Sequence, residues 1–311
     1  TLSAKDESYT ENDTVGKAGL EQYYEQYLRG QNGERKFYID TVGRISEIIS
    51  NTDSVAGDDL YLSIDADLQK ATYIALEREI AGIVYSNIKA GNIPIIDVYK
   101  ALIGNRVIDI SHFTEDDASA TEKGLYSSFK NTQKNVLKNI KKELTTSPKA
   151  LDQMSDETLD EFTHIISMLK DNGILLTSEI DTNDETYQKW KNQKISPKEY
   201  LNYCISQQWI DISQLSVDEK YADSSEVYDA LCNYILDHLK DDKDFDTIIY
   251  EYMIARGDIS PRKLCIILFE QGVLDYDDAT VNKLKNGTLA PYDFIMDKIN
   301  RVEITPAQLA L

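Results

Sequence analysis

The segment GKAGLEQYYEQYLRGQNG, residues 16–33, carries the most informative pattern in this chain of 311 residues. A Gly-x-x-Gly-x-Glu sequence precedes a predicted helix over residues 20–28, and Arg-Gly-x-x-Gly follows it. Because glycine adopts backbone conformations that a Cβ forbids, both ends of the helix are predicted to be tight turns. By spacing alone, the segment is a capped surface helix. Its defining residues are Gly16, Gly19, Glu21, Leu28, Arg29, Gly30 and Gly33.

A second ordered pattern lies in GDDLYLSIDADLQKATYIALE, residues 57–77. Residues 61–65 alternate like a half-buried strand, and Asp65 is suited to cap the helix that follows. Apolar spacing in that helix predicts a packing face made of Leu68, Thr72, Leu76, Ile80, Ile83 and Asn87. The residues that define the pattern are Gly57, Leu60, Leu62, Ser63, Ile64, Asp65, Leu68 and Gln69.

These two motifs, with RKFYIDTVGRISEI (residues 35–48) between them, resemble class B penicillin-binding proteins. The resemblance implies that residues 1–81 are part of the family's α+β pedestal, or dimerisation, domain. In that family the pedestal is non-catalytic and lies between a membrane anchor and a transpeptidase domain. Two earlier pedestal motifs of the family are missing before the first motif, which predicts that the chain is a fragment.

Residues 82–311 have helical hydrophobic spacing where the family enters its first transpeptidase strand. Helices are predicted over residues 94–104, 121–144, 155–171, 197–208, 224–240, 245–256, 261–271 and 292–302. A capping hydroxyl precedes a first-turn proline at Ser147-Pro148, Ser196-Pro197, Ser260-Pro261 and Thr305-Pro306. We therefore predict a pedestal fragment followed by an all-helical insert, predominantly α overall. The insert and its closing ITPAQLAL resemble clostridial members of the family, in which the transpeptidase domain would follow.

Three stretches of the insert share one shape, at residues 94–109, 197–211 and 261–275. Each begins with a proline-started helix and ends in two apolar residues and an aspartate. A degenerate repeat of helical hairpins explains the likeness. Similar chemistry at helix ends explains it equally well.

The charge, hydrophobicity and cysteine content of the chain argue against several classes of partner and site. It carries 54 acidic and 33 basic residues, a net charge of −21, which repels nucleic acid phosphates and anionic lipids. The longest apolar run, residues 264–269, is far shorter than the roughly 18 residues that cross a bilayer, so direct membrane insertion is not expected. Cys204, Cys232 and Cys265 lack CxxC spacing and are predicted to be buried core thiols.

Catalytic motifs are incomplete. Ser127-Ser-Phe-Lys130 and Ser260-Pro-Arg-Lys263 match the Ser-x-x-Lys pattern of the family, but no Ser-x-Asn, Lys-Thr-Gly or Lys-Ser-Gly occurs in the sequence. Ser260 is better explained as a helix cap, and Ser127 as an exposed helical position. No catalytic residue is therefore predicted in this chain.

Metal and cofactor motifs are also incomplete. His112, His164 and His238 are scattered and are interpreted as core or surface histidines. The segments after Asp181 and Asp242 resemble calcium loops, but both lack the glycine and the glutamate that such loops need, so they are interpreted as acidic turns. No P-loop or dinucleotide fingerprint is present, and no cofactor is predicted.

The resemblance implies a parent protein that is a membrane-anchored, extracytoplasmic serine D,D-transpeptidase able to bind penicillin. This chain would be its scaffold region, held at the membrane through an N-terminal segment. The implied partners are the parent's own transpeptidase domain and a polytopic membrane glycosyltransferase. Tyr23, Tyr24 and Tyr27 suit either an interface or helix packing. The alternative is a free-standing acidic helical module that binds proteins.

Overall fold

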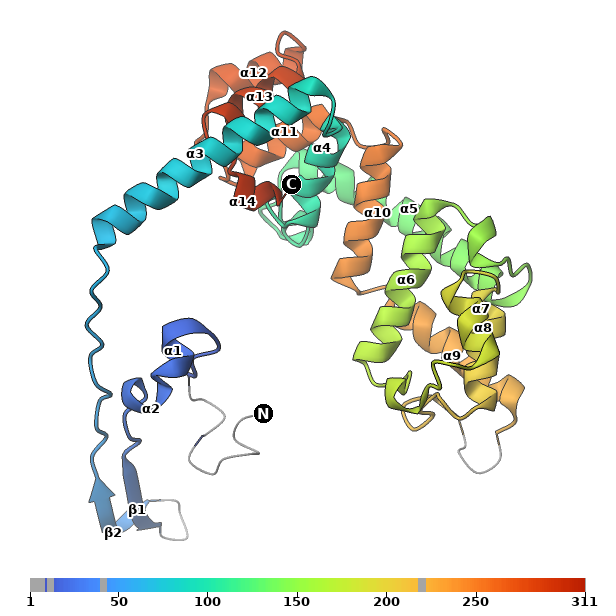
Figure 1. The fold of residues 1–311 in the computed structure, drawn as a ribbon, viewed down its shortest axis with the longest axis horizontal. Helices are drawn as coiled ribbons and strands as arrows, with labels where there is room; N and C mark the ends of the chain where they lie inside the picture. Colours follow the sequence, from blue (N-terminus) through green and yellow to red (C-terminus); the bar gives the residue numbers. More distant parts are fainter. Residues whose placement is uncertain (1–8, 10–13, 40–43, 218–221, 311) are drawn as a thin grey trace. The chain divides into compact units, whose positions relative to one another are not determined.

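The computed structural model describes residues 9, 14–39, 44–217 and 222–310. It divides into two compact units, Thr1–Ala71 and Thr72–Leu311, which are described separately (Figure 1). The first carries two short helices and a β-hairpin, and the second consists of helices joined by loops. The predicted fold class, α+β and predominantly α, is confirmed. The predicted boundary after residue 81 lies inside helix α3 (Ala66–Ala90) and stays a prediction.

The N-terminal unit is organised around an antiparallel hairpin that the sequence analysis did not predict. Its elements are α1 (Gly19–Tyr23), α2 (Glu25–Leu28), β1 (Glu34–Ile39) and β2 (Ile45–Thr52). Glu34 pairs with Thr52 and Ile39 with Ile45, and the register is irregular between these two pairs. The helix predicted over residues 20–28 is interrupted at Tyr24, so it forms two short pieces.

The strand predicted over residues 61–65 is wrong. This segment has no strand partner among the described residues, and its side chains are exposed, with Tyr61 at 88% and Ile64 at 57%. A strand needs a neighbour to satisfy its backbone N–H and C=O groups. Alternating hydrophobicity predicts the extended conformation but does not provide the partner.

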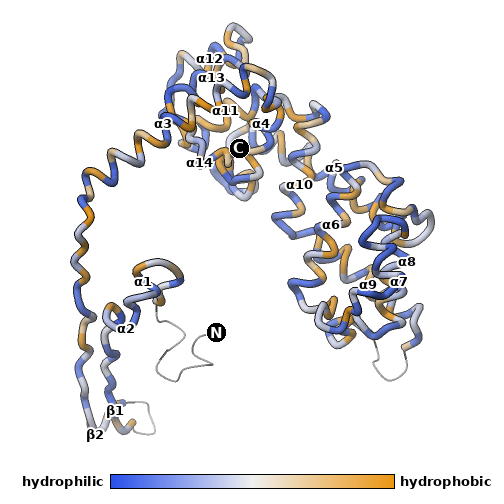
Figure 2. Tube along the Cα trace, viewed as in Figure 1, coloured by the Kyte–Doolittle hydropathy of each residue, from blue (hydrophilic) through white to orange (hydrophobic). Residues whose placement is uncertain are grey.

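Helix α3 begins as predicted but packs through a different face. The Leu68 amide donates to Asp65 Oδ1 at 2.9 Å, which confirms Asp65 as the N-cap. The buried residues of the helix are Glu77, Ala81, Val84 and Ile88. The stripe predicted to pack is exposed instead, at Leu68, Leu76, Ile80 and Ile83. Hydrophobic positions recur along the whole helix (Figure 2), so α3 carries two apolar stripes and periodicity alone could not say which one is covered.

Eight helices predicted for the helical unit are present, and their ends lie within two residues of the predicted ones. They are α4 (Ile95–Gly104), α5 (Ala120–Thr145), α6 (Asp156–Asp171), α8 (Pro197–Ser206), α9 (Ser224–His238), α10 (Lys243–Ala255), α11 (Pro261–Glu270) and α13 (Pro291–Asn300). Two short helices were not predicted, α7 (Glu185–Lys191) and α12 (Asp278–Asn286), whereas α14 (Pro306–Leu309) begins at the predicted Thr305-Pro306 pair. Single turns of 3-10 helix are η2 (His112–Thr114), η3 (Leu151–Gln153) and η4 (Thr177–Glu179).

A proline begins a helix at three of the four predicted pairs, but the hydroxyl before it caps the helix at only two of them. Ser196 and Thr305 cap α8 and α14 with their side chains, each within a capping box. Ser260 occupies the N-cap position of α11, but its side chain makes no capping hydrogen bond. Ser147-Pro148 starts no helix, because the Lys149 amide donates to Glu143 Oε2 at 3.1 Å and the segment folds back on α5.

The three similar stretches end in one backbone arrangement. A left-handed residue follows each helix, Arg106 after α4, Gln208 after α8 and Gly272 after α11. An amide further along then donates to a carbonyl of the last turn, as Ile108 does to Leu102 at 2.7 Å. The same ending follows α6, α10 and α13, which lie outside the three stretches. Helix-end chemistry therefore accounts for the likeness, and a true repeat stays a prediction.

The core of the helical unit is aromatic and aliphatic. Phe129 of α5 stacks on Tyr250 of α10 with ring centroids 4.4 Å apart, and Phe113 meets Tyr250 edge-on. All three cysteines are free and buried, as predicted. Burial raises the pKa of Cys204 to about 12 and that of Cys232 to about 11, which keeps these thiols protonated and unreactive.

Candidate functional site

The signature glycines lie where separate backbone segments meet. A Cβ on Gly57 would lie 1.9 Å from the Leu28 carbonyl oxygen, and one on Gly30 would lie 2.4 Å from the Val55 oxygen. Gly30 also has a φ of +72°, in the left-handed region. The backbone at the end of α2, at residues 28–30, lies directly against the backbone of residues 55–57. Both positions therefore require glycine, because no Cβ fits between the two segments.

Backbone hydrogen bonds join the first motif to the start of the second. Gln31 and Val55 exchange both of their N–H···O bonds, at 2.8 and 2.9 Å, and the Asp58 amide donates to the Tyr27 carbonyl at 2.7 Å. A Cβ on Gly33 would meet the Ser54 nitrogen at 2.7 Å. Gly16 donates to Glu25 Oε2 at 2.8 Å. The first motif and Gly57 thus form one structural unit.

We expect Gly57→Ala to open this unit. The new Cβ would meet the Leu28 carbonyl, and relieving such a clash costs about 1–3 kcal/mol of local strain. Hydrogen exchange at the Gln31, Val55 and Asp58 amides measures the opening. Gly82→Ala is the matched control, because Gly82 lies inside α3 with no atom within 4 Å of an added Cβ; it should stabilise the helix by about 0.5–1 kcal/mol. Unchanged exchange in Gly57→Ala would contradict the contact.

A cavity of about 470 Å³ lies beside the first motif, lined in part by Gly16, Glu21, Leu28 and Arg29. No nucleophilic cysteine or serine is among its described lining residues.

The remaining predicted residues lie on the second motif. Leu62, Ile64 and Leu68 are between 50% and 67% exposed, and Gln69 is exposed and helical. The predicted site residues are therefore of two kinds in the structure, glycines in close backbone contact and exposed side chains of the second motif.

The two Ser-x-x-Lys sequences lie within α5 and at the start of α11. Lys130 donates to Gln133 Oε1 at 2.8 Å, which directs its ammonium group along α5. Ser260 is the N-cap residue of α11, and its backbone carbonyl accepts from the backbone amide of Lys263. Within the described residues, no hydrogen bond joins the hydroxyl group of either serine to the ammonium group of its lysine.

The acidic segments that resemble calcium loops are helix starts. Asp184 accepts from the Tyr187 amide to cap α7, and Asp242 accepts from the Asp244 and Phe245 amides to cap α10. Asp242 also contacts His164 Nε2 at 2.7 Å. Burial would raise the pKa of Asp242, but the hydrogen bonds from His164 and from the Phe245 amide outweigh burial and lower that pKa. His164 is therefore held as part of the helix cap.

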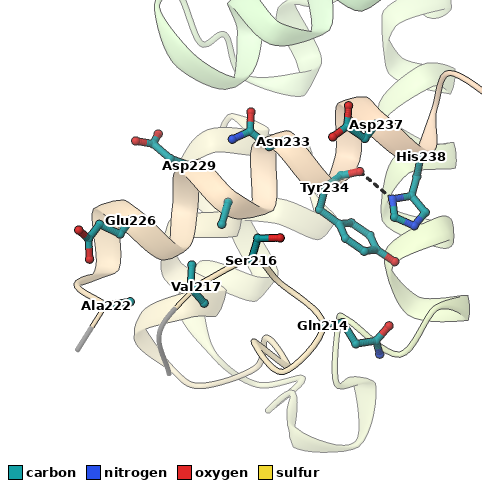
Figure 3. A pocket seen from close by; sticks show the side chains of 11 residues that line it. Gln214, Ser216, Val217, Ala222, Glu226, Asp229, Asn233, Tyr234, Asp237 and His238 are labelled. Atoms are coloured by element: carbon teal, nitrogen blue, oxygen red, sulfur yellow. Dashed lines mark hydrogen bonds between the residues drawn. The ribbon is translucent and has the colours of Figure 1, made fainter. Parts of the chain in front are cut away.

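A groove with a volume of about 950 Å³ runs along α9 (Figure 3). Its carboxylates are Glu226, Asp229 and Asp237, and Tyr234 stacks on His238 with ring centroids 3.8 Å apart. His238 Nδ1 lies 2.9 Å from the Tyr234 carbonyl oxygen, as the dashed line in Figure 3 marks. Glu226 accepts from the backbone amide of Asp223, the N-cap of α9, and Asp237 pairs with Lys240. The groove suits a cationic group, and its described lining joins no serine to a histidine by a hydrogen bond.

Within the described part of the chain, no helix combines the length and apolar composition needed to cross a membrane.

Residues 2–62 match the model of the Penicillin-binding Protein dimerisation domain. The chain is 38% identical over 90 residues to the peptidoglycan D,D-transpeptidase FtsI of Escherichia coli K12, which is 29% of this chain and 15% of FtsI. It is 30% identical over 86 residues to MrdA, the peptidoglycan D,D-transpeptidase of the same strain, covering 28% of this chain and 14% of MrdA. Penicillin-binding protein 2A of Bacillus subtilis 168 is 38% identical over 72 residues, covering 23% of this chain and 10% of that protein.

No solved structure matches the chain significantly. The resemblance to penicillin-binding proteins is confirmed at the level of the dimerisation domain and of homology to these transpeptidases. The matches cover about a seventh or less of each relative. The clostridial type and the helical insert stay predictions.

Proposed function

We propose that this chain is a non-catalytic scaffold region of a membrane-anchored peptidoglycan D,D-transpeptidase. The observation that carries the proposal is the match of residues 2–62 to the dimerisation domain. The backbone contacts of Gly30 and Gly57 support it. They explain why glycine stands at these positions of both motifs by the close approach of two backbone segments, without a role in catalysis. The scaffold positions a catalytic domain of the parent protein, which performs serine acyl transfer at the extracytoplasmic face of the membrane.

The exposed stripe of α3 is the surface proposed for contact with that catalytic domain. Within the helical unit, Leu76, Ile80 and Ile83 of this stripe are 42–60% exposed. A large exposed apolar surface is typical of an interaction site. The catalytic domain is the chosen occupant because the homologous proteins are transpeptidases, so such a domain belongs to the same polypeptide in those relatives.

A second proposed partner is a polytopic membrane glycosyltransferase of wall synthesis. Tyr23 and Tyr27 are 77% and 53% exposed on the signature helices, and tyrosine presents apolar area with a polar tip at interfaces. The net charge of −21 repels anionic lipid headgroups, so the chain would contact a membrane protein without being attracted to the lipid itself.

Fluorescent penicillin tests the proposal. We expect no covalent labelling of the 311-residue chain and labelling of the native parent protein in membranes, with the modified peptide outside these residues. The expected result follows because, in the part of the chain that the structure describes, no hydrogen bond joins the hydroxyl of Ser127 or Ser260 to a lysine or histidine side chain. Ser127→Ala and Ser260→Ala variants control for non-specific labelling. An adduct on either serine would overturn the scaffold assignment, and a parent protein that takes no label would favour the free-standing acidic helical module.

A further inference from the structure

His112 lies at the start of η2 with its imidazole ring fixed from one side. Its Nδ1 is 2.8 Å from Glu122 Oε1, and Glu122 is fully buried in the first turn of α5. The same carboxylate accepts from the Ser119 amide at 2.7 Å and from Gln271 Nε2 at 2.7 Å. These partners come from three parts of the helical unit, so Glu122 cannot turn away from the ring.

This network decides which ring nitrogen is free. A carboxylate that already accepts from Ser119 and Gln271 acts as an acceptor toward His112, so Nδ1 carries the hydrogen of the neutral ring. The lone pair of neutral imidazole then lies on Nε2, on the side away from Glu122. A buried carboxylate behind the ring is the arrangement that orients metal-binding histidines in proteins.

Two further carboxylates lie close to His112. Asp117 Oδ1 is 3.5 Å from His112 Nε2, and His112, Glu115 and Asp117 each offer one ligand atom such that the three atoms lie within 4.8 Å of one another. The short loop that carries both carboxylates is anchored by buried Phe113 and Ala118. The three groups are therefore gathered by the fold of the loop as well as by their nearness in sequence.

We propose that His112, Glu115 and Asp117 bind a divalent transition metal ion, with Zn²⁺ as the best fit. Ligand atoms about 2.0–2.1 Å from a tetrahedral Zn²⁺ lie roughly 3.3–3.4 Å apart, close to the 3.5 Å between Nε2 and Asp117 Oδ1. Glu115 is exposed and can move toward the ion by a rotamer change. One imidazole and two carboxylates suit Zn²⁺ better than Ca²⁺ or Mg²⁺, which prefer oxygen ligands alone. Water would complete the coordination, and the ion would tie η2 to the start of α5.

Calorimetric titration of ZnCl₂ into the metal-free 311-residue chain tests the site. We expect one saturable ion per chain. Glu115→Ala and Asp117→Ala should each weaken binding by about tenfold or more. Glu122→Gln should weaken it by about 10–100-fold, because the ring loses its charged acceptor and the new NH2 group faces one of the donors that the carboxylate now accepts from. Asp116→Ala is the matched control, since Asp116 is equally exposed in the same loop but lies outside the cluster, and it should leave the affinity unchanged.

Cobalt substitution identifies the ligands independently. Co²⁺ at this site should give the ligand-field bands of oxygen and nitrogen coordination, without the sulfur charge-transfer band that a cysteine site would show. Absence of saturable Zn²⁺ binding, equal binding by Asp117→Ala, or a sulfur band would each overturn the proposal. The first of these results would mean that His112 simply forms an ion pair with its two neighbouring carboxylates.

Discussion

Ile88→Asp is expected to detach α3 from the helical unit and to lower its stability by about 4 kcal/mol or more, whereas Ile83→Asp leaves it folded. Ile88 is 5% exposed and Ile83 is 60% exposed, five residues apart on the same helix. The substitution at Ile88 would bury a carboxylate with no positively charged group beside it. Such an uncompensated buried charge costs about 3–5 kcal/mol of stability. That is a large part of the stability of an ordinary domain.

Thermal and urea denaturation followed by circular dichroism measure the difference. Ile83→Asp should change the free energy of unfolding by no more than about 0.5 kcal/mol, because it alters only an exposed position. Equal destabilisation by both substitutions would show that both stripes of α3 are packed in solution.

The contrast between these two residues also explains what the sequence could predict. Helix positions in the helical unit followed from local signals, namely apolar spacing, capping residues and first-turn prolines such as Pro197 and Pro261. Which stripe of α3 is buried depends on helices far away in the sequence, so no local pattern could decide it. The hairpin of β1 and β2 was missed for a related reason, because its exposed side chains show no clean alternation.

The residues of the candidate sites also fall into two groups, those that local sequence patterns predict and those that only long-range contacts reveal. Gly30 could be identified as a position for unusual backbone geometry, and its φ of +72° agrees. The close approach of Gly57 to Leu28 joins residues 29 positions apart and could not be read from either motif. Glu122 and Gln271 are 149 residues apart, so the network that orients His112 was invisible in the sequence. Residues that act through distant partners therefore need the folded structure to be found.

Glu161 carries the second large expected effect, which depends on pH. It is 4% exposed in α6, and burial raises its pKa from 4.5 to about 8, with Glu157 and Asp160 adding to the shift and Arg256 opposing it. Between these two values the folded chain keeps a proton that the unfolded chain has released. The folded state then binds more protons than the unfolded state, so stability falls as the pH rises from about 4.5 to about 8.

Glu161→Gln is expected to remove this penalty, because the amide stays neutral in both states and keeps the shape of the protonated acid. Each pKa unit corresponds to about 1.4 kcal/mol, so the gain in unfolding free energy approaches about 5 kcal/mol at most above pH 8 and vanishes below pH 4.5. Urea denaturation at several pH values across this window measures the gain. Asp246, whose pKa burial raises to about 6, leaves part of the pH dependence in the variant. The exposed Glu179→Gln is the control and should show no such gain. If Glu161→Gln destabilises the chain at alkaline pH, the buried carboxylate is ionised and paired with Arg256 instead.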